Sequence, residues 1–149
     1  MSTISETTVR VRYAETDQMG VVYYANFFVW FEVARVELMR QMGFSYKQME
    51  FEDDSFVVVA KASCTYKRPA RFDDVIRICT RVTEARRRTI TFSYEVINDA
   101  TRELVATGET LHVICGHDGR PKSLPEKYRP YFPLGRSSDG VGAEAPQRS

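Results

Sequence analysis

The sequence predicts an α+β domain in which one long helix packs against an antiparallel sheet. One segment places apolar residues at three- and four-residue steps, which is the spacing of an amphipathic helix. Four later segments are rich in β-branched and aromatic residues, which indicates strands. The links between these strands are short enough for hairpins or a meander, so the sheet is expected to be antiparallel. One helix followed by a group of strands is the pattern of the α+β class.

The first strand is expected near the N-terminus. Val9, Val11 and Tyr13 alternate with arginines, which is the period-two pattern of a strand, and this strand is expected to end near Ala14. The turn-forming segment 15–20 follows it directly.

The long helix is expected from about Tyr24 to Met42. Gly43 comes directly after it, at the position where glycine commonly ends a helix. Such a helix makes about five turns and is roughly 28 Å long. Its apolar face is expected to consist of Phe27, Trp30, Phe31, Ala34, Leu38 and Met42.

The later strands are expected at residues 56–67, 75–83, 89–97 and 103–115. The links between them are residues 68–74, 84–88 and 98–102. In the second and third of these strands apolar and polar residues alternate, so one face of the sheet is expected to pack against the helix while the other faces water.

The strand at 56–67 differs from the others because it is apolar on both faces. Its two apolar sets are Phe56, Val58, Ala60 and Ala62 on one side, and Val57 and Val59 on the other. One long helix cannot cover both faces of a strand, so we expect a second subunit to cover it.

Composition and charge exclude several classes of function. The chain has 21 Lys and Arg against 20 Asp and Glu, a formal net charge of +1, so no global field attracts nucleic acid or an anionic membrane. No apolar segment approaches the roughly 18 residues of a membrane span, and the first residues lack the apolar core of a signal peptide. The three cysteines form no Cys-x-x-Cys pair, which is typical of reduced thiols in the cytosol. We therefore expect a soluble cytoplasmic protein that binds no nucleic acid and does not insert into membranes.

The chain is expected to form one domain over residues 1–134. Residues 124–132 are expected to make a short helix, with Pro125 in its first turn. Residues 135–149 are mostly small and polar, so we expect a disordered tail.

The segment 15–27 carries the candidate chemistry. It places Asp17 and Gly20 just before the N-terminus of the expected helix. N–H groups at a helix N-terminus stabilise negative charge on a substrate oxygen, and a nearby carboxylate attacks a carbonyl or deprotonates water. Chemistry on an acyl group is therefore the candidate reaction. The structural alternative is that Asp17 only caps a turn, as aspartate before a helix commonly does.

Other catalytic arrangements find little support. The sequence has no phosphate-binding glycine loop, no metal-ligand spacing and no nucleophile-elbow motif, so we expect neither a metal nor a cofactor. His112 is expected to form a hydrogen bond at a strand edge rather than to bind a metal.

Two motifs resemble a known family. TDxxGVVYxxN followed by an aromatic residue stands at 16–27, and KRPARFDDVI stands at 67–76. With the order of elements over residues 7–133, they resemble the hotdog-fold 4-hydroxybenzoyl-CoA thioesterase-like group, which includes short-chain acyl-CoA thioesterases associated with the Tol-Pal cluster. The resemblance implies an antiparallel five-stranded sheet wrapped around a central helix. It also implies a homodimer, or a homotetramer of two such dimers, in which two helices lie side by side under a continuous sheet and each active site lies at the subunit boundary.

The same resemblance assigns roles within the site. Asp17 matches the family's catalytic aspartate, and the backbone N–H of Tyr24 or a close neighbour is expected to polarise the thioester carbonyl. Many of these thioesterases carry histidine where this chain has Tyr24, so a titrating imidazole is absent from that position. Gly20, Val22 and Asn26 are expected to contact substrate, with a helix cap as the alternative role of Asn26.

Coenzyme A carries phosphates, which require cations at the mouth of the site. Two clusters are candidates, namely Lys67, Arg68 and Arg71 in one link and Arg86, Arg87 and Arg88 in another. The alternative for each cluster is a solvated hairpin tip.

Glu32 on the helix is a rival acid, because some hotdog enzymes place their acid on this helix. The plainer interpretation is a buried ion pair between Glu32 and Arg35.

These observations predict an enzyme that hydrolyses the thioester of an acyl-CoA, or of an acyl carrier protein, with Asp17 as nucleophile or general base. A second hypothesis is a non-catalytic acyl-thioester-binding protein, motivated by Tyr24 at the usual histidine position. A hotdog dehydratase is disfavoured because it needs a histidine near the helix.

Overall fold

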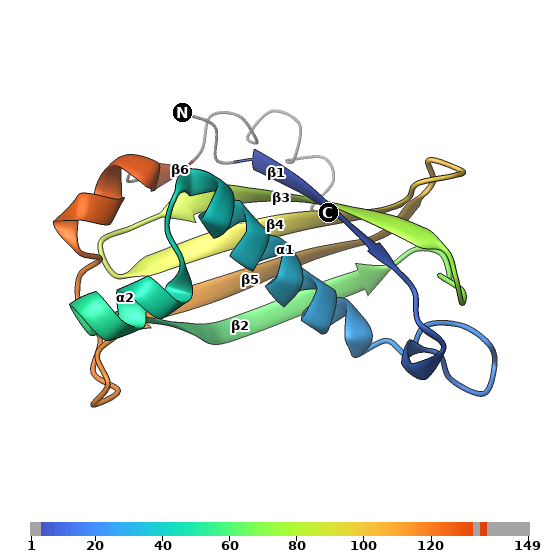
Figure 1. Ribbon diagram of the computed structural model, residues 1–149, viewed down its shortest axis with the longest axis horizontal. Coiled ribbons are helices and arrows are strands. Elements are labelled where there is room, and N and C mark those ends of the chain that lie inside the picture. Colours follow the sequence, from blue (N-terminus) through green and yellow to red (C-terminus); the bar gives the residue numbers. More distant parts are fainter. Residues whose placement is uncertain (1–3, 133–134, 137–149) are drawn as a thin grey trace.

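The computed structural model describes residues 4–132 and 135–136, which form a sheet with the long helix α1 laid obliquely across one face (Figure 1). The α+β class is confirmed. The helical elements are η1 (Tyr13–Glu15), α1 (Asn26–Met42), α2 (Tyr46–Asp53) and η2 (Glu126–Tyr131). The strands are β1 (Ile4–Arg10), β2 (Phe56–Tyr66), β3 (Val75–Ala85), β4 (Thr89–Asn98), β5 (Leu104–Cys115) and β6 (Gly135–Arg136).

The strands are antiparallel in the order β1-β3-β4-β5-β2, and β6 pairs with the end of β3. Links 84–88 and 98–102 join neighbouring strands, as predicted. The hairpin expected at 68–74 is wrong, because β2 pairs with β5, from Phe56 opposite Cys115 to Tyr66 opposite Ala106. This link therefore carries the chain from the edge strand β2 across the sheet to β3.

The first strand lies further toward the N-terminus than expected. β1 pairs with β3 from Ile4 opposite Arg81 to Arg10 opposite Val75, and it does not continue to Ala14. Instead the chain bends into the one-turn helix η1, where the carboxylate of Glu15 accepts a hydrogen bond from the N–H of Arg12 at 2.8 Å.

The long helix α1 begins two residues after the expected start and ends as predicted. Gly43 adopts φ of +103°, and its N–H donates to the carbonyl of Arg40 while the N–H of Phe44 donates to that of Met39. These bonds form a Schellman-type end, which requires the left-handed backbone that glycine accepts most readily. The buried face contains every residue predicted for it, together with Arg35 and Met39.

Helix α2 was not predicted, because Met49 is its one fully buried residue and it lacks an apolar face. The side chain of Ser45 caps it by accepting a hydrogen bond from the N–H of Gln48 at 3.2 Å. The expected short C-terminal helix is present as the 3-10 helix η2, which starts directly after Pro125.

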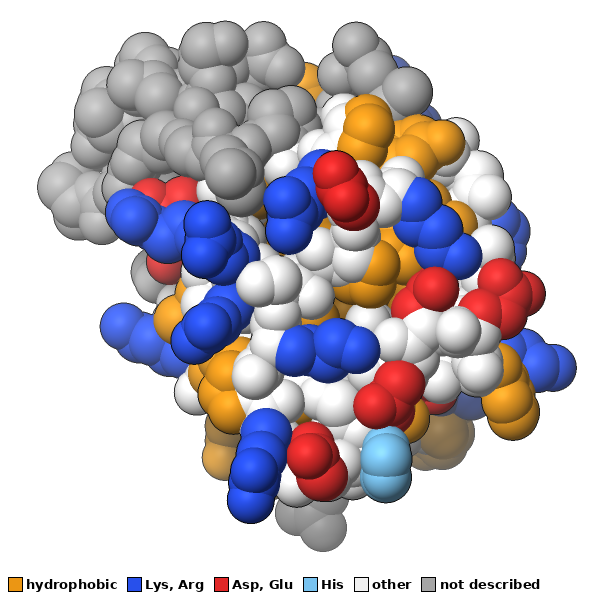
Figure 2. Space-filling view, turned by 90° about the vertical axis from the view of Figure 1, so that its left-hand side faces the viewer, with side chains coloured by type: hydrophobic (Ala, Val, Ile, Leu, Met, Phe, Trp, Pro, Cys, Tyr) orange, Lys and Arg blue, Asp and Glu red, His pale blue; other side chains and the backbone are white. Residues whose placement is uncertain are grey.

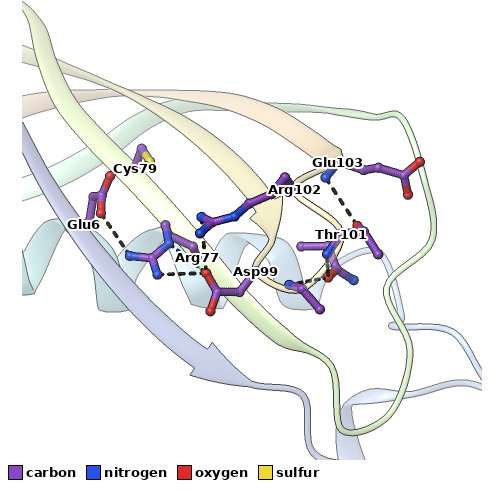
Figure 3. A network of polar contacts seen from close by, with 9 residues as sticks. Glu6, Arg77, Cys79, Asp99, Thr101, Arg102 and Glu103 are labelled. Carbon is purple, nitrogen blue, oxygen red and sulfur yellow. Dashed lines mark hydrogen bonds and ion pairs between the residues drawn. The ribbon is translucent and has the colours of Figure 1, made fainter.

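The sheet face turned away from α1 carries a polar network (Figure 3). Arg77 donates to the carboxylate of Asp99 at 2.7 Å and 3.0 Å, and to Glu6 at 2.9 Å. Hydrogen bonds and charge from Asp99 and Glu6 raise the pKa of Arg77. The network joins β1, β3 and the link after β4, and it keeps this face polar as the strand alternation predicted.

The edge strand β2 is largely exposed along its length. Val58 and Val59, which point to opposite faces, are 47% and 46% exposed. No helix in the described part of the chain is long and apolar enough to cross a membrane. The expected tail begins with the paired strand β6, and residues 137–149 lie outside the described residues.

Candidate active site

Asp17 opens a tight turn between η1 and α1. Its carbonyl accepts a hydrogen bond from the N–H of Gly20 at 3.0 Å, and Gly20 has φ of +81°. This angle lies in the left-handed region, which glycine adopts more readily than other residues. Carboxylate oxygen Oδ1 of Asp17 accepts hydrogen bonds from the N–H groups of Met19 at 2.8 Å and Val21 at 3.4 Å. Asp17 therefore does cap the turn, but it does so through Oδ1 alone. Among the described residues, Oδ2 of Asp17 has no hydrogen-bond partner.

Backbone bonds fix this turn to the neighbouring link. The N–H of Asp17 donates to the carbonyl of Val21 at 2.8 Å, and the N–H of Val22 donates to that of Ala70 at 2.8 Å. Thr16 Oγ1 donates to the carbonyl of Tyr13 at 2.7 Å, so this hydroxyl is used within the loop. The turn is therefore held in place although Asp17 itself is exposed in the single chain.

The N-terminus of α1 presents free donors beside this turn. Among described residues, no hydrogen bond engages the N–H groups of Tyr24 and Ala25, the latter being the N-cap. The carbonyl of Tyr24 accepts hydrogen bonds from Tyr66 Oη at 2.9 Å and from the N–H of Phe27 at 3.3 Å. The peptide group whose N–H belongs to Ala25 is thus anchored through the carbonyl of Tyr24, while the N–H groups of Tyr24 and Ala25 remain open for a negatively charged oxygen.

Asn26 is the first residue of α1 rather than its cap, so the cap interpretation is wrong. Its Nδ2 donates to the backbone carbonyl of Glu15 at 2.8 Å. The side chain therefore links the helix start to the end of η1.

Glu15 is a buried residue beside the Asp17 turn that the sequence did not single out. It is buried beneath the turn, and its carboxylate accepts hydrogen bonds from Arg12 and from the indole of Trp30 at 3.1 Å. Nothing in the sequence distinguishes Glu15 from the other acidic residues, of which the chain has 20 in all.

Exposed aromatic and apolar side chains surround the turn. Tyr13, Met19 and Tyr24 are 78%, 80% and 59% exposed. Tyr66 packs edge-on against Tyr24. The pKa of Tyr66 is raised, and burial is the largest cause of that rise. Such a patch is typical of a surface that a ligand or a second subunit covers.

The two predicted cation clusters lie at opposite ends of β3. Residues 67–71 lie beside the turn, where Arg71 pairs with Val21, while Arg68 forms an ion pair with Glu103 at 3.6 Å. The triplet 86–88 follows the far end of β3, about 33 Å away for a strand of this length. That end of the molecule carries further Lys and Arg side chains mixed with acidic ones (Figure 2).

The predicted ion pair between Glu32 and Arg35 is wrong. Glu32 is exposed, whereas Arg35 is 9% exposed and lies against Tyr46, Tyr94 and His112. Neither side chain has a salt bridge in the described part of the chain.

His112 is a core residue and not a strand-edge one. It is fully buried, and its Nε2 lies 2.8 Å from Thr110 Oγ1. Burial and the nearby positive charge of Arg35 lower the pKa of His112 from 6.5 to about 3. The imidazole is therefore neutral at physiological pH, and it lies away from the Asp17 turn on β5.

Comparison with known proteins supports one family. Residues 11–132 match the model of the thioesterase-like superfamily. The acyl-CoA thioester hydrolase YbgC of Escherichia coli O6:H1 is 35% identical over 127 residues, which cover 84% of this chain and 92% of that protein.

Solved structures agree with this match. The DHNA-CoA thioesterase of Staphylococcus aureus has a TM-score of 0.78 at 32% identity, covering 97% of this chain and 91% of that one. The 4-hydroxybenzoyl CoA thioesterase of Pseudomonas sp. strain CBS-3 has a TM-score of 0.80 at 21% identity, covering 87% of this chain and 99% of that one. The second likeness concerns the fold alone, and it confirms the hotdog fold that the sequence motifs implied.

Proposed function

The chain belongs to the thioesterase-like superfamily, and from this membership we propose that it is an acyl-CoA thioesterase, which hydrolyses acyl-CoA to the free acid and the thiol. The observation that carries the residue assignment is the position of Asp17. Its turn is fixed by backbone bonds directly before α1, and its Oδ2 is free of hydrogen bonds among the described residues.

Asp17 can act by either of two routes. As a general base it takes a proton from water, whose oxygen then bonds to the carbonyl carbon as the C–S bond breaks and the thiolate leaves. As a nucleophile its Oδ2 bonds to the carbonyl carbon and expels the thiolate, and water then hydrolyses the resulting anhydride. Both routes need a carboxylate with one accessible oxygen, which fits a side chain capped only through Oδ1.

The N–H of Tyr24 is the proposed donor to the thioester oxygen, with that of Ala25 as its neighbour. Both reaction routes place negative charge on this oxygen, and fixed backbone donors stabilise that charge without reorganising. The N–H of Tyr24 shares its peptide group with the carbonyl of Tyr23, which accepts the N–H of Asn26 at 2.9 Å and so fixes the orientation of this donor. The hydrogen bond from Tyr66 to the carbonyl of Tyr24 orients the next peptide group, whose N–H belongs to Ala25.

We propose that a second copy of the chain completes the site. A carboxylate exposed as Asp17 is in the single chain lacks the water-excluded surroundings that strengthen such chemistry. The edge strand β2 and the α1 residues Val29 and Val33, which are 50% and 40% exposed, offer an apolar surface for that partner. A homodimer, alone or doubled into a homotetramer, fits this surface.

The cations Lys67 and Arg71 lie in the link that flanks the Asp17 turn, so they are proposed to bind the phosphates of the substrate. Arg68 is partly engaged by Glu103. The triplet 86–88 lies too far along β3 to serve the same chain's site and would act only from the partner subunit. Gly20 and Val22 are proposed to contact the pantetheine arm or the acyl group.

The carrier of the acyl group is proposed to be coenzyme A, with an acyl carrier protein as the alternative. We propose the cytoplasm as the location, because all three cysteines are free thiols, which suits a reducing compartment.

The test is thiol release from a panel of short, long and aromatic acyl-CoAs. Wild-type protein should turn over at least one class, and Asp17→Asn should abolish release while fold and dimer persist. Undiminished turnover in Asp17→Asn would eliminate the assignment of Asp17. Saturable acyl-CoA binding without release by the wild type would instead favour the non-catalytic binding protein suggested by Tyr24.

A further inference from the structure

We infer that Glu15 is a positioning residue for this reaction, which it serves by fixing the Asp17 turn against the N-terminus of α1. The inference rests on the function proposed for Asp17 and for the N–H of Tyr24. Glu15 touches neither reacting group through its side chain. It acts through the two elements that carry them.

The carboxylate of Glu15 joins the end of β1 to α1. Its side chain is 8% exposed. Oε1 accepts the backbone N–H of Arg12 at 2.8 Å, and Oε2 accepts the indole N–H of Trp30 at 3.1 Å and the guanidinium of Arg12 at 3.4 Å. Every partner is an N–H donor, so both oxygens must accept, which only a carboxylate does.

The backbone of Glu15 makes the second half of the connection. Its carbonyl accepts hydrogen bonds from the N–H of Tyr23 at 2.9 Å and from Asn26 Nδ2 at 2.8 Å. Tyr23 directly precedes Tyr24, and Asp17 lies two residues after Glu15. The acid and the proposed oxyanion donor are therefore both placed by reference to a single buried residue.

This arrangement matters because catalysis is sensitive to small displacements. A shift of about 1 Å between reacting groups costs on the order of 100-fold in rate. The Asp17 turn itself is exposed, and its own hydrogen bonds are either local or reach the link 68–74, so its position relative to α1 depends on the contacts beneath it.

Glutamine at position 15 distinguishes this role from simple packing. Its amide has the shape of the carboxylate, but its NH₂ must face either the N–H of Arg12 or that of Trp30, and donor then meets donor. Replacing Trp30 by Phe removes the indole N–H, so the NH₂ can occupy the Oε2 position while the exposed guanidinium of Arg12 moves aside. The second substitution should therefore rescue the first.

The experiment measures kcat and KM for Glu15→Gln, Trp30→Phe and the double variant, on the acyl-CoA that the wild type hydrolyses fastest. Glu15→Gln should lower kcat about 10- to 100-fold while KM changes less than about threefold. Trp30→Phe should lower kcat less. The double variant should be no slower than Trp30→Phe alone.

A matched control sits at the other end of the molecule, where Tyr128 Oη donates to the carboxylate of Asp53 at 2.6 Å. Tyr128→Phe deletes a carboxylate hydrogen bond of the same kind but far from the Asp17 turn (Figure 1). It should lower the melting temperature and leave kcat unchanged. An equal fall of kcat in Tyr128→Phe and Glu15→Gln would show a general loss of rigidity and overturn the inference.

Asp17→Asn separates the two proposals. If Asp17→Asn is inactive while Glu15→Gln and Trp30→Phe keep wild-type kcat, the positioning role fails and the proposed function stands. If Asp17→Asn keeps full activity, the proposed function fails and this inference fails with it. Should Glu15→Gln not fold, Trp30→Phe alone decides, and wild-type kcat in that variant overturns the inference.

Discussion

The ring of Phe31 occupies the space that a side chain on Gly108 would need. A Cβ built on Gly108 would lie 2.3 Å from Cζ and 2.4 Å from Cε2 of Phe31. The same ring stacks on Tyr94, with centroids 4.2 Å apart and planes inclined by 10°. The missing side chain therefore lets α1 rest directly on β4 and β5, and this contact sets the height of the helix above the sheet.

Gly108→Ala should destabilise the fold, because the added methyl group displaces Phe31 from Tyr94. Overpacking of this kind costs about 1–3 kcal/mol, measurable as a lower urea midpoint with an unchanged m-value. Phe31→Leu removes the clashing ring atoms, so Gly108→Ala should cost less in that background. Full stability of Gly108→Ala would show that the ring is not confined as described.

Asp17 has a turn-capping role and a proposed chemical role, and two substitutions separate them. Asn retains an oxygen for the N–H of Met19 but loses the negative charge, so Asp17→Asn should stay close to wild-type stability and lose activity. Asp17→Ala loses the hydrogen bond as well and should be less stable by about 1 kcal/mol. Thermal unfolding and thiol release, measured on both proteins, check this. Equal stability of the two variants would mean that the bond to Met19 contributes nothing.

The exposed valines of α1 predict the subunit contact. Val33→Lys places a charge in the proposed helix-to-helix interface, so the dimer dissociation constant should rise at least about tenfold. Sedimentation velocity should show monomer at concentrations where the wild type is dimeric, and acyl-CoA hydrolysis should fall with it. Thr107→Lys, on the sheet face away from α1, is the control and should leave the dimer intact. An unchanged dimer in Val33→Lys would place the interface elsewhere.

The sequence was sufficient to predict the elements whose pattern is local. Helix α1 has an apolar stripe and ends at Gly43, and β3 and β4 alternate along their lengths, so these elements lie close to where they were expected. Helix α2 has no such stripe. Its one usable signal was Ser45 followed three residues later by Gln48, which is the spacing of a capping box.

The pairing of β2 with β5 could not be read from the sequence. A link of the length of 68–74 can close a hairpin or cross the sheet, and only the packing of the whole sheet decides between them. The site shows the same limit. Asp17 was identified from its motif, whereas Glu15 became visible only once the fold brought Arg12 and Trp30 to its carboxylate.

Buried His112 predicts how stability depends on pH. Its imidazole packs edge-on against Phe92, with ring centroids 5.2 Å apart, and lies near Thr110 and the guanidinium of Arg35 from α1. Its pKa of about 3 lies below the ordinary 6.5. The unfolded chain therefore binds the proton first as the pH falls, so this residue should leave stability unaffected above about pH 6.5 and lower it progressively below. The slope should approach about 1.4 kcal/mol per pH unit.

Urea unfolding between pH 7.5 and 4.5 measures this slope above the range in which Asp53 and Asp54 titrate, since Tyr128 and His117 respectively lower the pKa values of those carboxyls below 3.8. Protonation of Asp53 and Asp54 also lowers the stability of the fold as the pH falls, but it does so at a lower pH than protonation of the unfolded chain at His112. His112→Leu removes the imidazole, whose Nδ1 has no hydrogen-bond partner among the residues that the structure describes, so the fall in stability between pH 6.5 and 4.5 should flatten. His117→Asn replaces the chain's other histidine and should keep the slope. A slope that survives in His112→Leu would assign the pH dependence to groups outside this cluster, and the buried imidazole would then have no part in it.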